Sequence, residues 1–108
     1  MTGKEIDTAA QEYENLKGHA QALQEKLVHV TNDLREHKRV LETIEDIDSD
    51  RVAYRLVGEV LIKETVKEVK PYLSNTISSL QEVVKKLEEQ LAGTEKQLLE
   101  LRDKIETK

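Results

Sequence analysis

The chain has 108 residues, of which 37% are hydrophobic and 36% charged, with 3% aromatic residues and a single proline. A composition with many charged residues and few loop-forming residues indicates long helices or coiled coil, and it argues against a globular core filled by aromatic side chains. The formal net charge of −5 and the scattered Lys and Arg argue against nucleic-acid binding, which requires a basic surface.

The absence of cysteine and the hydropathy of the chain exclude further kinds of site and of protein. The chain has no cysteine, which excludes disulfides and thiolate metal sites. No apolar run approaches the roughly 18 residues of a membrane span, and the first residues have no signal-peptide core. We expect a soluble, cytoplasmic protein without a membrane partner, forming one domain over residues 1–108.

The first predicted element is a helix over about residues 4–46, which carries a heptad repeat with a narrow apolar seam. Only His37 interrupts this seam, and we interpret it as a polar residue that fixes the register. The acidic run "EDIDSD" then ends the helix, because Asp and Ser compete with the helical backbone for hydrogen bonds. The first seam comprises Ile6, Ala9, Tyr13, Leu16, Ala20, Leu23, Leu27, Val30, Leu34, His37, Leu41 and Ile44.

The middle stretch, about residues 51–63, has the pattern of a β-hairpin. Gly58–Glu59 is flanked by β-forming residues, and a glycine at the first central position suits a two-residue type II′ turn. This turn predicts that Val57 pairs with Val60 and Leu56 with Leu61.

Both faces of the predicted hairpin are largely apolar. Since an isolated two-stranded hairpin is marginal in water, we expect it to pack against hairpins of other subunits. Arg55 is either a charge that protects a strand edge or, as we favour, a contact to a neighbouring subunit. The predicted assembly residues are Val52, Tyr54, Arg55, Leu56, Val57, Gly58, Val60, Leu61 and Ile62.

A second helix is predicted over about residues 65–108. Thr65 and Glu68 form a capping-box pattern at its start, and Pro71 lies just before a change in seam spacing at Leu73–Ile77. Two helices of similar length on a short connector predict a mostly α fold, an antiparallel two-helix coiled-coil hairpin with one β-hairpin at the connection. The second seam comprises Val66, Val69, Leu73, Ile77, Leu80, Val84, Leu87, Leu91, Thr94, Leu98, Leu101 and Ile105.

This helix–hairpin–helix order and the central run resemble the β-type subunits of the prefoldin family. The chain departs from the family pattern at two positions. Glu59 stands where the family often has a second glycine, and Ala53 stands where it often has cysteine. The matching residues are Tyr54, Arg55, Val57, Gly58, Val60, Leu61, Glu64, Thr65, Val66, Lys67, Glu68, Val69 and Pro71.

The resemblance implies a chaperone that is not an enzyme and uses no cofactor or metal. It implies a heterohexamer of α-type and β-type subunits in which the hairpins form a double β-barrel body and coiled-coil arms hold unfolded proteins. Actin and tubulin are the clients that it implies, and a group II chaperonin is the partner that receives them.

We predict that clients contact the ends of the two helices, the arm tips. Gly18 and Gly93 weaken the helices, and the apolar seams continue beyond both, so the tips should open easily. Ordinary seam packing is the competing interpretation for part of this surface. The predicted tip residues are Ile6, Ala9, Tyr13, Leu16, Leu98, Leu99, Leu101 and Ile105.

Other functions have weaker support in the sequence. The three histidines, at 19, 29 and 37, do not have the spacing of a zinc site, and no serine has a His–acid pair in view. The main alternative is a structural coiled-coil tether or adaptor without chaperone activity, for which a β-hairpin would be unnecessary.

Overall fold

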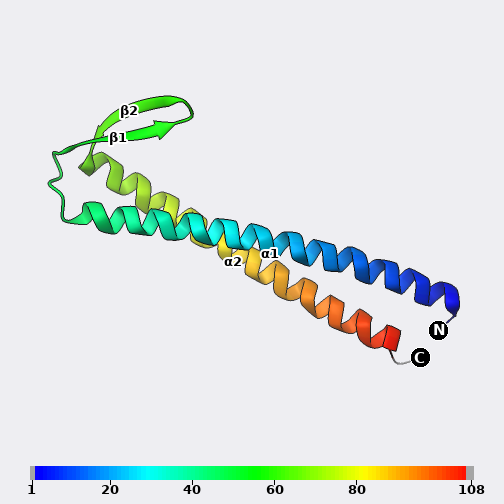
Figure 1. Cartoon of the computed structure of the whole chain (residues 1–108). Helices are drawn as coiled ribbons and strands as arrows, with labels where there is room; N and C mark the ends of the chain where they lie inside the picture. The colour runs from blue at the N-terminus through cyan, green and yellow to red at the C-terminus, as the bar shows by residue number, and fades with distance from the viewer. Residues whose placement is uncertain (1, 107–108) are drawn as a thin grey trace. The chain divides into compact units, whose positions relative to one another are not determined.

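A computed structural model describes residues 2–106. The elements, in chain order, are α1 (Gly3–Glu45), β1 (Val52–Val57), β2 (Val60–Thr65) and α2 (Val66–Glu106) (Figure 1). α1 begins and ends one residue before its predicted bounds, α2 begins one residue after its predicted start, and β2 continues to Thr65. The second helix was predicted to continue through residues 107 and 108, which lie outside the described residues. The predicted fold class, two antiparallel helices with one β-hairpin between them, is confirmed.

The first of two structural units, the terminal unit, comprises Met1–His29 and Val84–Lys108. Within it the first half of α1 runs antiparallel to the last half of α2, so that the beginning of α1 and the end of α2 lie at the same end (Figure 1). Its buried residues are Ala9, Leu23, Leu87 and Thr94. Thr94 is the polar member, and its hydroxyl donates to the Gln90 carbonyl at 2.9 Å, which satisfies it within the helix.

The second unit, the hairpin unit, comprises Val30–Val83 and holds the end of α1, both strands and the start of α2. Its buried residues are Val66, Leu73 and Ile77, of which Val66 is only 3% exposed. Lys70 of α2 donates from Nζ to the Glu45 carbonyl at 3.3 Å. A cation at that position supplies the favourable charge that the acidic end of α1 lacks.

Burial along both helices follows the predicted seams. Every residue of the two seams is buried or half-buried, His37 included. Among the described helical residues outside the seams, only Thr31, Lys70 and Thr76 share that property. The heptad repeat therefore identified the packed face of each helix correctly.

The hairpin has the predicted register and turn. Val57 pairs with Val60, Leu56 with Leu61 and Val52 with Thr65, in an antiparallel two-stranded sheet. Gly58 has a φ of 62°, and no other residue among those described has a positive φ. A type I′ turn requires positive φ at both central residues, so a negative φ at Glu59 agrees with type II′.

Candidate functional site

The register divides the hairpin into two faces with different surroundings. The outer face carries Val52, Tyr54, Leu56, Leu61, Lys63 and Thr65. The inner face carries Ala53, Arg55, Val57, Val60, Ile62 and Glu64. Side chains alternate between faces along each strand, and directly paired residues share a face.

The outer face is an exposed apolar surface. Tyr54 is 62% exposed, Leu56 67% and Leu61 62%, and Val52 is also exposed. Contiguous exposed apolar residues on one side of a sheet are typical of a surface that another protein covers. A two-stranded sheet also has unpaired backbone groups at both edges, which favours pairing with further strands.

Part of the inner face is covered within the hairpin unit. Ala53, Arg55, Ile62 and Glu64 are half-buried, whereas Val57 and Val60 beside the turn are exposed. The covered half is the end of the hairpin next to α2, and the apolar residues at the turn remain available.

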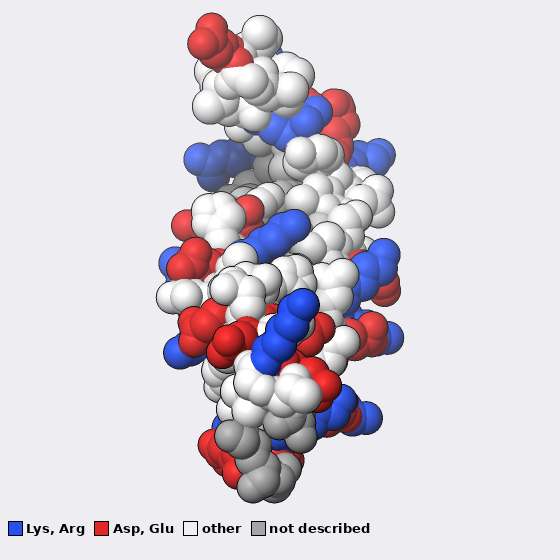
Figure 2. Space-filling model, turned by 90° about the vertical axis from the view of Figure 1, so that its right-hand side faces the viewer, with Lys and Arg blue, Asp and Glu red and all other residues white. Residues whose placement is uncertain are grey.

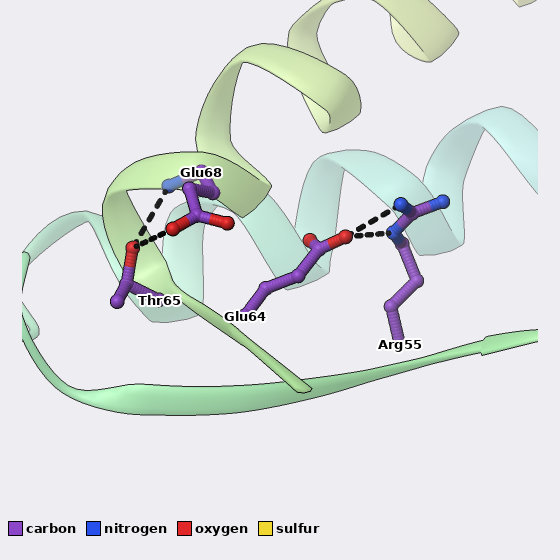
Figure 3. A network of polar contacts seen from close by, with 4 residues as sticks. All are labelled: Arg55, Glu64, Thr65 and Glu68. Carbon is purple, nitrogen blue, oxygen red and sulfur yellow. Dashed lines mark hydrogen bonds and ion pairs between the residues drawn. The ribbon is translucent and has the colours of Figure 1, made fainter. Parts of the chain in front are cut away.

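Arg55 connects three elements on the inner face. Its Nε and Nη2 both donate to Oε1 of Glu64, at 3.1 and 2.5 Å (Figure 3). Its guanidinium carbon lies 4.2 Å from the centroid of the Tyr72 ring on α2. The hydrogen bond to Glu64 raises the pKa of Arg55 above its ordinary value, so the guanidinium is charged at every physiological pH.

The junction between β2 and α2 is fixed by backbone and side-chain hydrogen bonds. The Val66 N–H donates to the Arg51 carbonyl at 2.9 Å, and the Lys67 N–H donates to the Ser49 carbonyl at 3.0 Å. The Glu68 N–H donates to the Thr65 hydroxyl at 3.4 Å, and that hydroxyl donates to the Glu68 carboxylate (Figure 3). These bonds satisfy N–H groups that a helix start leaves without an intrahelical partner.

The predicted tip residues all belong to the terminal unit, and most of them are partly covered. Ala9 is buried, and Leu99 is exposed at 52%. The other six are half-buried, consistent with packing between the two helices: Ile6, Tyr13, Leu16, Leu98, Leu101 and Ile105.

Open grooves in the terminal unit bring five of these residues together. Leu16 and Leu101 line one groove with polar neighbours from both helices. Tyr13 and Ile105 line a second groove, together with Ala10, and Ala9 and Leu101 line a third. Ile6, Leu98 and Leu99 line none of these three grooves. Each of these grooves is lined by both apolar and charged side chains.

Charge and candidate ligand residues add no further site. Lys and Arg are interspersed with Asp and Glu over the face drawn in Figure 2, and neither sign gathers into a patch there. Within residues 2–106, no three His, Cys, Asp or Glu side chains converge as metal ligands would. None of the helices in that range has the length and hydropathy to cross a membrane.

Sequence reasoning missed the two partners of Arg55, Glu64 on the inner face and Tyr72 on α2. The predicted hairpin ended at about residue 63, but its register continued by one residue pairs Ala53 with Glu64 and places Glu64 on the same face as Arg55, so this partner could have been inferred. Tyr72 could not have been inferred as a partner of Arg55, because its position depends on the direction that α2 takes after β2. The structure gives Arg55 partners within its own chain, whereas the prediction emphasised a neighbouring subunit.

Comparison with known proteins identifies the family. Residues 8–108 match the family described as "Prefoldin subunit". Prefoldin subunit 2 of Bos taurus is 36% identical over 106 residues, which covers 95% of this chain and 69% of that protein. Prefoldin subunit 2 of Homo sapiens is 36% identical over 92 residues, which covers 85% of this chain and 60% of that protein.

A solved structure agrees with these sequence matches. The prefoldin beta subunit from Thermococcus strain KS-1 is similar with a TM-score of 0.86 and 25% sequence identity, covering 95% of this chain and 90% of that chain. The predicted resemblance to β-type prefoldin subunits is confirmed, and both relatives named above are prefoldin subunit 2. On the strength of its fold, its hairpin and these matches, the chain belongs to the prefoldin subunit family, whose members are chaperone subunits and not enzymes.

Proposed function

We propose that the chain is a β-type subunit of a heterohexameric prefoldin in the cytoplasm, where it assembles with α-type and other β-type subunits. In this role it is an ATP-independent holdase that captures unfolded proteins such as actin and tubulin and delivers them to a group II chaperonin. The observation that carries the proposal is the exposed apolar outer face of the hairpin.

The outer face supports assembly because its composition does not suit a surface left in water. Tyr54, Leu56 and Leu61 are each more than 60% exposed, and they lie on a short sheet with open edges. Covering them with the hairpins of neighbouring subunits would remove apolar surface from water and pair the free strand edges.

Client capture is assigned to the tip residues of the terminal unit. Their support is the combination of open grooves lined in part by apolar side chains and the exposed side chain of Leu99. Each such contact with a non-native chain is weak, so affinity would come from several arms acting on one client.

Native mass spectrometry of the chain mixed with α-type and β-type partner subunits tests the assembly role. We expect a hexamer that requires this chain, and we expect the purified hexamer to suppress aggregation of denatured actin without ATP. A chain that never enters a hexamer would refute the assembly role. A hexamer that forms but leaves aggregation unchanged would favour the structural tether.

A further inference from the structure

Arg55 lies at a junction of three elements of the hairpin unit. It comes from β1, its hydrogen-bond acceptor Glu64 comes from β2, and Tyr72 beneath the guanidinium comes from the second turn of α2. One side chain thus contacts both strands and the helix that follows them (Figure 3 shows the contact between the strands).

The chemistry of this junction suits arginine in particular. A guanidinium is planar, so it can donate two hydrogen bonds in its plane to a carboxylate while its face lies against an aromatic ring. The Glu64 side chain is 11% exposed and the Arg55 side chain 27%, so the pair is shielded from water more than an ordinary surface ion pair. Lysine would keep the charge but would lose both the paired donors and the stacking.

We propose that Arg55, Glu64 and Tyr72 form an intrachain clamp, which positions the hairpin on α2 before the subunit meets its partners. Arg55 is then a positioning residue for assembly and not a contact to a neighbouring subunit. The inference rests on the proposed function in one respect, because it takes the outer face of the hairpin as the surface that partners cover.

The clamp has a defined task because the hydrogen bonds at the β2–α2 junction restrain only the base of the hairpin, at Ser49, Arg51, Val66 and Lys67. Two strands alone are marginal in water, and Val57 and Val60 beside the turn are exposed. Without the clamp, the strands beyond this junction would vary more in their orientation relative to α2, and a smaller fraction of chains would present the outer face correctly. Apparent affinity falls in proportion to the competent fraction.

Hydrogen exchange of the free full-length chain tests the clamp without any partner. Arg55→Met and Tyr72→Leu should each accelerate exchange of amides in residues 52–65, by about two- to fivefold, the range that exposed cation–π contacts and ion pairs support. Tyr72→Phe keeps the ring and is the matched control, with exchange near that of the unmodified chain. Amides of residues 84–98, in the terminal unit, should be unchanged in all variants.

The double variant separates a clamp from two independent losses. If Arg55 and Tyr72 act together, Arg55→Met combined with Tyr72→Leu should accelerate exchange little more than either single change. Multiplicative effects of the two changes would show that the residues act separately and would overturn the proposal.

Assembly kinetics then distinguish positioning from a subunit contact. A clamp that pre-positions the hairpin predicts slower association of Arg55→Met with the partner subunits, by a factor similar to its change in exchange, and nearly unchanged dissociation. If Arg55→Met leaves exchange in the free chain unchanged but accelerates dissociation of the hexamer, Arg55 contacts a neighbouring subunit and the proposal is wrong.

The outcome is separable from that of the proposed function. Leu61→Asp, on the opposite face and outside the clamp, tests whether the outer face mediates assembly. If that variant assembles normally, the proposed assembly surface fails, and the exchange measurements on the free chain still decide whether the clamp exists.

Discussion

At the scale of single residues, Gly58 controls the geometry of the hairpin. Its φ of 62° lies in the left-handed region, where a β-branched side chain is strained. A Cβ built at Gly58 would meet no atom within 4 Å, so a substitution there would be opposed by backbone conformation alone and not by a clash.

We therefore predict that Gly58→Val destabilises the turn by about 1–3 kcal/mol, the usual cost of such backbone strain. Assembly with partner subunits, followed by size-exclusion chromatography, should weaken markedly. Glu59→Ala is the matched control, because Glu59 has a negative φ that alanine adopts freely. Equal and negligible effects of the two changes would mean that the turn does not control assembly.

At the scale of elements, we expect changes in the hairpin to affect assembly and changes at the helix ends to affect client binding. Leu61→Asp would place a carboxylate on the outer face, where assembly would bury it without a partner charge. An unpaired buried charge is costly enough to prevent that burial, so we expect loss of the hexamer while circular dichroism retains most of the helix signal.

Leu99→Asp is the matched control for this change. Leu99 is 52% exposed and Leu61 62%, but Leu99 lies on α2 in the terminal unit. We expect Leu99→Asp to assemble normally and to suppress client aggregation less well. Two variants with the same effect on assembly would contradict the separation of assembly from client binding.

The two helical glycines test whether the arm tips must open. A Cβ at Gly18 or Gly93 would meet no atom within 4 Å, so alanine should stabilise the helix by about 1 kcal/mol at each position without a steric penalty. We expect Gly18→Ala with Gly93→Ala to slow hydrogen exchange in the terminal unit and to reduce client capture. Ala92→Gly, at an exposed helical neighbour, should do the reverse; unchanged capture in both would show that opening is irrelevant.

The elements also show what the sequence could and could not predict. Heptad spacing identified the buried face of both helices because one periodicity determines which residues face inward. Gly58 determined the register because a two-residue turn leaves no freedom in the pairing. The stacking of Arg55 on Tyr72 was not predictable, because it depends on the path from Thr65 into α2, which the connector hydrogen bonds to Val66 and Lys67 define.

At the scale of the whole molecule, assembly and client binding are expected to use separate surfaces. The outer face belongs to the hairpin unit and the tip residues to the terminal unit. Removal of one surface should therefore leave the other working, and a hexamer that gathers several tips should lose capture by steps as tips are removed.

The final prediction removes residues 1–12 and 99–108. The deletion takes away five of the eight tip residues, Ile6, Ala9, Leu99, Leu101 and Ile105. It keeps the whole hairpin unit, Val30–Val83, and the seam residues Leu23 and Leu87 that are buried in the terminal unit. We expect the shortened chain to assemble, because the hairpin and its junction with α2 are intact. Suppression of aggregation of denatured actin should fall in part when only this subunit is shortened, because the other arms still bind.

The control shortens the tips of every subunit in the hexamer, and it decides whether clients bind the tips or the body of the assembly. A hexamer in which every arm is shortened should lose most of its capacity to hold a denatured client, since each arm contributes weakly and their contributions combine. If that hexamer still suppresses aggregation as well as the full-length complex, clients bind the body of the assembly, and the tip residues are not the client site.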